Sequence, residues 1–186
     1  EGYSELIENS EIELIVIGLP NHLHFEVAAA ALKAGKHVVL EKPMTSSLQE
    51  AIELVEIANE NRCLLTVFHN RRWDGDFLTI RKLIKEGRLG EVVHYEAHFD
   101  RYRLEVDGRW KEQEGAGGGI FYDLGSHLID QALNIFGHPD EVLLNLGTQR
   151  IDAKQPDYFH LLMNYGARRV ILHGATIVYE SMPRYI

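Results

Sequence analysis

A segment near the middle of the chain carries side chains that could move protons. Asp123, His127 and Asp130 follow one another at spacings of four and three residues, which places them on one face of a helix. An imidazole exchanges protons near neutral pH, and a carboxylate one turn away can orient it. On spacing alone, such a pair is more often a local surface pair than a catalytic one, so both interpretations stay open.

A lysine follows a short apolar run in "VVLEKPM" (38–44). The run ends on Glu41 and Lys42, and Pro43 then restricts the backbone. An ammonium group held there could donate a hydrogen bond to a reacting oxygen and stabilise its negative charge. A solvated surface lysine explains the residue equally well at this stage.

The same residues do not predict a metal centre. Asp123 and His127 would need a third ligand, and no Cys or Glu is obviously offered. His94 and His98 share a strand face, but at ~3.3 Å per residue they lie roughly 13 Å apart. We therefore expect no metal site.

Alternating strand and helix patterns in the first part of the chain would position Lys42. Short apolar runs occur at 13–18, 37–41 and 63–68. The first reads as a strand buried on both faces. Helical patterns separate the runs, so the sequence predicts a parallel sheet with crossover helices.

Capping residues mark the two helices between these strands. Asn21 can cap the first helix and Gly35 can end it. Ser46 or Ser47, with Gln49 or Glu50 three positions later, forms a capping-box signature for the second.

Polar, proline-containing or basic segments follow all three strands. They are "GLPNHLH" (18–24), "EKP" (41–43) and "HNRRW" (69–73). In an open parallel sheet, ligands bind outside the carboxyl ends of the strands. The sequence therefore favours a ligand site at this edge.

The pattern changes near residue 70. An amphipathic helix at 76–90 is followed by a long strand at 91–103 and a helix at 121–137. Three further strands are predicted, and the connection "NYGARR" between the last two is typical of a hairpin. They lie at 141–150, 157–166 and 168–180. These consecutive strands predict an antiparallel sheet covered by helices.

A glycine cluster, "GAGGGI" (115–120), precedes the 121–137 helix. Glycine-rich loops at helix N-termini can hold phosphate. The dinucleotide fingerprint G-x-G-x-x-G is not formed, because position 120 is Ile and no buried strand precedes the loop. A tight turn or a substrate loop is the favoured interpretation, with phosphate binding as the minor alternative.

Composition narrows the class of protein. Lys and Arg number 19 against 28 Asp and Glu, a net charge of −9, which argues against nucleic-acid binding. The single cysteine, Cys63, excludes a disulfide framework and favours a reducing compartment. No apolar run approaches the ~20 residues of a membrane span and no signal peptide is seen, so we expect a soluble, cytoplasmic protein without membrane or nucleic-acid partners.

Two separated motifs carry a family resemblance. "VIGLPNHLHFEVAAAALKAGKHVVLEKPM" (16–44) and "GGGIFYDLGSHLIDQALNIFG" (117–137) resemble the glucose-fructose oxidoreductase/inositol dehydrogenase (Gfo/Idh/MocA) family. Within that family, residues 69–84 and 109–133 are most similar to the scyllo-inositol dehydrogenase branch, which is usually NADP-linked.

The resemblance implies a fold and a domain organisation. Residues 1–70 would form the C-terminal part of a Rossmann (parallel-sheet) domain, and residues 71–186 an incomplete α+β domain with a mostly antiparallel open sheet. That sheet commonly joins subunits, which implies a homo-oligomer, either a dimer or a tetramer. Family members carry the G-x-G-x-x-G half before the point where this chain begins, so the chain looks truncated at both ends.

The resemblance also assigns residue roles. Lys42 matches the active-site lysine, His127 the catalytic histidine, and Asp123 the aspartate one turn before it. The positions that match contacts to NADP or NAD are Pro20, Asn21, His24, Glu41, Lys42, Asn70 and Arg71.

The implied reaction is hydride transfer between nicotinamide and a secondary alcohol of a sugar or polyol, of which inositol is an example. His127 would take the hydroxyl proton while Lys42 stabilises the oxygen. The alternative is a non-catalytic fragment or sensor of the same family, which binds sugar or dinucleotide or only oligomerises.

Overall fold

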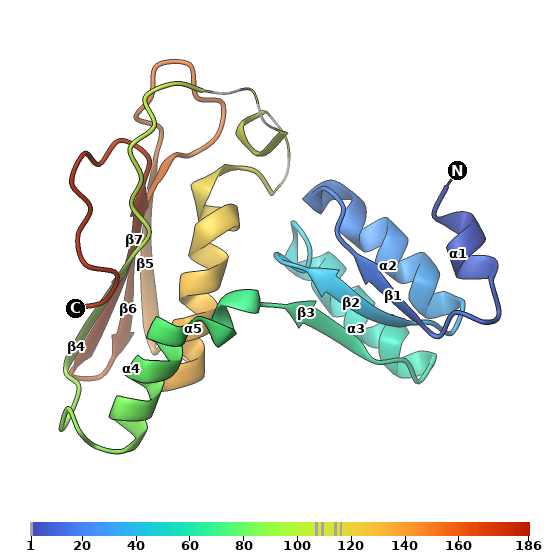
Figure 1. The fold of residues 1–186 in the computed structure, drawn as a ribbon, viewed down its shortest axis with the longest axis horizontal. Coiled ribbons are helices and arrows are strands. Elements are labelled where there is room, and N and C mark those ends of the chain that lie inside the picture. The colour runs from blue at the N-terminus through green and yellow to red at the C-terminus, as the bar shows by residue number, and fades with distance from the viewer. Residues whose placement is uncertain (1, 107, 109, 114, 116) are drawn as a thin grey trace. The chain divides into compact units, whose positions relative to one another are not determined.

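The structure, a computed structural model, describes residues 2–106, 108, 110–113, 115 and 117–186. The chain forms two compact units (Figure 1). The first runs to His69 and includes the glycine segment at 115–117, and the second comprises 70–114 and 118–186. Among the described residues, none of the helices is both long enough and apolar enough to cross a membrane.

The first unit is built around a three-stranded parallel sheet of order β1-β2-β3, as the sequence predicts. The strands end at one edge, where the polar segments after β1 and β2 begin. The elements are α1 (Ser4–Glu8), β1 (Leu14–Ile17), a 3₁₀ turn (Asn21–Leu23), α2 (His24–Lys33), β2 (His37–Glu41), α3 (Leu48–Glu60) and β3 (Leu65–Phe68).

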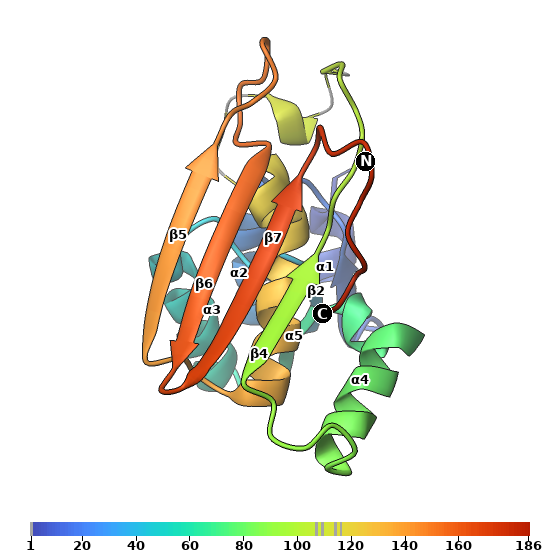
Figure 2. The same cartoon turned by 90° about the vertical axis from the view of Figure 1, so that its left-hand side faces the viewer.

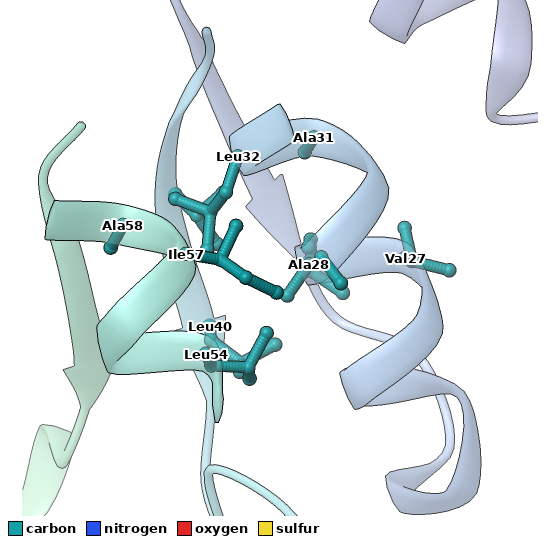
Figure 3. Close-up of a cluster of buried hydrophobic side chains, with 11 residues drawn as sticks. Val27, Ala28, Ala31, Leu32, Leu40, Leu54, Ile57 and Ala58 are labelled. Carbon is teal, nitrogen blue, oxygen red and sulfur yellow. The ribbon is translucent and has the colours of Figure 1, made fainter. Parts of the chain in front are cut away.

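One face of this sheet carries the core. Leu32 from α2, Leu40 from β2 and Leu54 from α3 are fully buried together (Figure 3). The expectation that the first strand is buried on both faces is wrong, because Leu14 and Val16 are 49% and 68% exposed. Helices α2 and α3 pack against each other and share one core, so they cover only one set of alternating strand side chains.

The helix ends follow the predicted signals with one exception. Ser47 caps α3, and its side chain accepts a hydrogen bond of 3.2 Å from the Glu50 amide. Gly35 ends α2 with a φ of +77°, a conformation that glycine adopts at no steric cost. Asn21 does not cap α2, because it begins a 3₁₀ turn and Leu23 occupies the N-cap position of α2.

The second unit holds a four-stranded sheet of order β4-β7-β6-β5. The elements are a 3₁₀ turn (Asn70–Trp73), α4 (Gly75–Lys85), β4 (His94–His98), a 3₁₀ turn (Trp110–Glu112), a π-helical turn (Phe121–Gly125), α5 (Ser126–Phe136), β5 (Glu141–Gly147), β6 (Tyr158–Tyr165) and β7 (Arg168–Ala175).

This sheet is mostly antiparallel, as expected. Strand β6 pairs antiparallel with β5 and β7, and the predicted hairpin turns at Gly166. Strand β4 pairs parallel with β7, and the long connection that a parallel pair requires contains α5, β5 and β6. The C-terminal residues continue the sheet, since the His98 amide donates to the Arg184 carbonyl at 2.9 Å.

Helix α5 covers one face of the second sheet (Figure 2). Leu128 of α5, Phe159 of β6 and Leu172 of β7 are fully buried in this second core. On the opposite face, the described part of the chain places no helix. That face is called the open face below.

Candidate active site

Lys42 lies directly after β2, at the carboxyl edge of the first sheet. Its side chain is half-buried, and its amide donates to the Glu41 carboxylate at 3.3 Å. The peptide bond between Lys42 and Pro43 is cis. Lys42 directly follows β2, and the proline after it restricts the backbone conformation of the lysine.

His24 connects the two loops at this edge. Its imidazole is completely buried. The Nδ1 atom lies 2.8 Å from the Pro43 carbonyl, and Nε2 lies 2.9 Å from the Leu19 carbonyl. His24 thus holds the loop after β1 and the loop after β2 at fixed positions. Its predicted contact with a cofactor stays a prediction.

Asn21 anchors the glycine segment within the first unit. The buried side chain donates from Nδ2 to the Gly117 carbonyl at 2.7 Å. A Cβ at Gly117 would lie 2.6 Å from Ser46 Oγ and 3.1 Å from the Asn21 Cβ. Pro20 precedes the 3₁₀ turn that positions Asn21. The contact supports close packing as the use of this glycine.

Asp123 of the second unit lies in the π-helical turn that precedes α5. Such turns within helices are frequent at functional sites. The Asp123 carboxylate accepts a hydrogen bond of 2.5 Å from Lys111 Nζ. Gly125 permits the turn to pack closely, since a Cβ there would lie 2.8 Å from the Phe121 ring.

His127 occupies the first turn of α5, four residues after Asp123. Its side chain is buried, and its neighbours Leu124 and Leu128 belong to the second core. The sequence interpretation as a surface pair is therefore wrong for His127. A buried imidazole is shielded from bulk water, which suits proton exchange with a bound group.

Asp123 lines a pocket formed entirely by the second unit. The pocket walls are strongly charged, and their basic side chains outnumber the acidic ones. The charged residues are Arg101, Arg103, Lys111, Glu112, Asp123, Arg150 and Asp157. This set suits a ligand rich in hydroxyl or anionic oxygens.

A buried ion pair supports one wall of the pocket. Arg150 Nε donates to Asp157 at 2.9 Å, and its Nη2 donates to Glu112 at 2.7 Å. Burial acts to lower the pKa of Arg150, but the hydrogen bonds to Asp157 and Glu112 outweigh it and raise the pKa. Sequence reasoning missed these residues, because it placed Arg150 and Asp157 at the ends of two predicted strands, whereas β5 ends at Gly147 and β6 begins at Tyr158.

The remaining predicted residues lie in the second unit. Asp130 accepts two hydrogen bonds from Arg72, at 2.6 and 2.7 Å. These hydrogen bonds raise the pKa of the Arg72 guanidinium. Arg71 donates to Asp74 at 3.0 Å. Asn70 begins the 3₁₀ turn and belongs to the second unit, whereas the predicted first domain ends at residue 70.

The predicted residues thus form two sets. The first unit gathers Pro20, Asn21, His24, Glu41 and Lys42 around the carboxyl ends of β1 and β2. In the second unit, Asp123 and His127 adjoin a charged pocket and a core helix.

Comparison with protein families assigns both units to one class. Residues 1–69 match the oxidoreductase family with an NAD-binding Rossmann fold. Residues 77–185 match the GFO/IDH/MocA C-terminal domain. The class is the oxidoreductase family with an NAD-binding Rossmann fold, and the chain belongs to the Gfo/Idh/MocA family, as its two motifs predict.

Individual relatives agree with this assignment. The uncharacterized oxidoreductase YdgJ of Escherichia coli is 51% identical over 97% of the chain and 52% of YdgJ. The scyllo-inositol 2-dehydrogenase (NADP(+)) IolW of Bacillus subtilis is 49% identical over 97% of the chain and 51% of IolW. The solved structure of yvaA from Bacillus subtilis superposes with a TM-score of 0.95 at 48% identity, covering 99% of this chain and 53% of yvaA. The chain spans about half the length of the relatives it matches.

Proposed function

We propose that the protein is an NAD(P)-dependent dehydrogenase that acts on a secondary alcohol of a sugar or polyol resembling inositol. The observation that carries the proposal is Lys42, which follows β2 of an NAD-binding domain in a loop held by His24. The name of IolW, a scyllo-inositol 2-dehydrogenase that uses NADP(+), supports an inositol-like substrate and favours NADP over NAD.

The donor set at the carboxyl edge of the first unit fits a nicotinamide dinucleotide. Lys42, Glu41 and Asn21 place an ammonium group, a carboxylate and a buried amide at this edge, and the Asn21 Nδ2 atom donates to the Gly117 carbonyl. Ribose hydroxyls and a carboxamide need both donors and acceptors of this kind. When bound, the nicotinamide would accept or supply the hydride.

The roles of the protein side chains follow from their chemistry. Lys42 donates a hydrogen bond to the reacting oxygen and stabilises the negative charge that develops there. His127 accepts the hydroxyl proton during oxidation and returns it to the carbonyl oxygen during reduction. Asp123, held by Lys111, orients the substrate or His127.

Turnover in the full-length protein tests the proposal. Initial rates are measured with scyllo-inositol, myo-inositol and glucose, each with NADP⁺ and with NAD⁺. Lys42→Met and His127→Asn should each lower kcat/KM by about 10²–10⁴-fold. Lys85→Met, at an exposed position of α4, is the matched control and should retain full activity. Normal turnover in either active-site variant would contradict the assigned roles.

A second candidate is a chain that binds without turnover. The 186 residues contain no G-x-G-x-x-G sequence, and that loop supplies the pyrophosphate contacts in Rossmann domains. Fluorescence titration of this chain with NADPH, beside an activity assay, separates the two candidates. Saturable binding without turnover would favour the non-catalytic alternative for this chain.

We also propose a cytoplasmic homo-oligomer, a dimer or tetramer, that associates through the open face of the second sheet. Leu143, which alternates with the core-facing residues of β5, is 69% exposed on that face. Leu143→Glu should shift the mass measured by light scattering towards the monomer. An unchanged mass for the variant, or a monomeric parent protein, would contradict this interface.

A further inference from the structure

A cluster of imidazoles and a carboxylate lies on the open face of the second sheet. On β4 and β7, Ala97 and Leu172 face the core beneath α5. His98 and His173, which are direct partners in the parallel pair β4–β7, therefore point to the opposite face. Figure 2 shows this face, with α5 behind the strands. Asp100 follows His98 by two residues, so it returns to the same side.

The donor atoms of the cluster are spaced like metal ligands. His98 Nδ1 lies 3.5 Å from Asp100 Oδ2, and His173 Nε2 lies 3.5 Å from Asp100 Oδ1. One ligand atom from each of the three residues lies within 4.8 Å of the other two. Charge-assisted hydrogen bonds are shorter, ~2.7–2.9 Å. Ligands of a tetrahedral ion with bonds of ~2.0–2.1 Å are separated by about 3.4 Å.

Two of these candidate ligand atoms are buried and make no hydrogen bond to a described residue. Among the residues that the structure describes, His98 Nδ1 and Asp100 Oδ1 have no hydrogen-bond partner. The Asp100 side chain is only 2% exposed, and those of His98 and His173 are 10% and 16% exposed. A buried carboxylate needs a compensating positive charge, and a bound cation would provide it.

The neighbouring residues orient both imidazoles for this purpose. Glu96 Oε2 lies 3.0 Å from His98 Nε2, so a proton on Nε2 leaves the Nδ1 lone pair facing Asp100. His160 Nδ1 lies 3.4 Å from His173 Nδ1, which similarly leaves His173 Nε2 as the free donor atom. Ligating histidines commonly hold their other nitrogen in this way, and the partner fixes the tautomer.

We propose that His98, Asp100 and His173 bind a divalent transition-metal ion of the zinc type. The set contains two neutral nitrogen donors and one carboxylate, and it leaves a tetrahedral ion one position for water. The site joins β4 to β7 on the face away from α5, which carries His127. It therefore lies on the opposite face of this sheet from His127.

The sequence did not predict this site, because its ligands are distant in the chain. His94 and His98 were the pair that strand spacing suggested, and in the structure both contact Glu96. His173 joins the cluster only through the parallel pairing of β4 with β7. The expectation of no metal site rested on local spacing, which carries no information about that pairing.

Calorimetric titration with ZnCl₂ tests the proposal. The protein, without an affinity tag, is first dialysed against a chelator and then against buffer. We expect one Zn²⁺ per chain and a higher midpoint of thermal unfolding with the ion. Co²⁺ in the same site should give the visible absorption of a tetrahedral complex. A parent protein that binds no Zn²⁺ would overturn the proposal.

Variants distinguish this site from adventitious binding. Asp100→Asn keeps the shape of the side chain but removes its charge, and it should weaken Zn²⁺ binding by more than about 100-fold. Glu96→Gln should weaken it by about 10–100-fold, as loss of an orienting partner does. His138→Gln, at an exposed position outside the cluster, should leave binding unchanged. Equal binding by the parent and a folded Asp100→Asn variant would show that Zn²⁺ binds elsewhere, and loss of binding in His138→Gln alone would also contradict the assignment.

Discussion

Gly117 packs against the side chains of Ser46 and Asn21, and its φ of +78° lies in the left-handed region. An alanine there must strain its backbone and displace Ser46, so Gly117→Ala should lower the free energy of unfolding by about 1–3 kcal/mol. Gly87→Ala is the matched control, because Gly87 has a φ of +67° with nothing within 4 Å of an added Cβ. Urea unfolding of both variants isolates the contribution of the contact. Equal losses would show that the contact itself is unimportant.

The ion pair between Arg72 and Asp130 attaches the 3₁₀ turn to α5. Its two hydrogen bonds are short, and the Asp130 side chain is 10% exposed, although that of Arg72 is 43% exposed. Because solvent screens the guanidinium, a double-mutant cycle with Arg72→Ala and Asp130→Asn should give a coupling energy of only about 1 kcal/mol. The exposed pair Lys82–Glu86, at 3.9 Å, should give less than about 0.5 kcal/mol. A larger coupling in the exposed pair would contradict this ranking.

At the scale of elements, β4 carries a buried phenol. Burial raises the pKa of Tyr95, and its hydroxyl has no hydrogen-bond partner among the described residues. Because the pKa of Tyr95 is higher in the folded state, the neutral phenol contributes to the stability of the fold. This contribution is complete below the unfolded-state pKa of ~10 and decreases as the pH rises above it. Tyr95→Phe should therefore keep the free energy of unfolding of the parent at neutral pH, and its free energy of unfolding should fall less than that of the parent at alkaline pH.

Urea unfolding across this pH range checks the prediction for Tyr95. Tyr179→Phe is the control, because Tyr179 is exposed and its replacement should leave the alkaline loss unchanged. If the free energy of unfolding decreased equally in the parent and in Tyr95→Phe, the loss of stability at alkaline pH would belong to other groups.

Local signals predicted the elements well, and contacts between distant residues were not predictable from them. The strand run 37–41 and the Ser47 cap follow from alternation and capping chemistry. The exposed face of β1 and the parallel pairing of β4 with β7 depend on where other elements pack. The same division applies to the candidate site, where Lys42 follows from strand position but the position of Arg150 depends on a contact with the distant residue Glu112.

At the scale of the whole molecule, the described residues form two hydrophobic cores. Leu54 belongs to the first and Leu128 to the second, and both are fully buried. Leu54→Ala and Leu128→Ala should each lower the free energy of unfolding by about 2–5 kcal/mol. Hydrogen exchange should increase mainly in residues 2–69 for Leu54→Ala and mainly in residues 118–186 for Leu128→Ala. Equal increases in both ranges for each variant would mean that the cores unfold as one.

The contacts of His24 have a practical consequence for redesign. One imidazole contacts the carbonyls of Leu19 and Pro43, so the two loops that follow β1 and β2 share a single support. Exchange of one loop alone would therefore disturb the support of the other. In this protein, a library that varies residues 19–21 should vary residues 43–46 in the same clones and keep His24 constant.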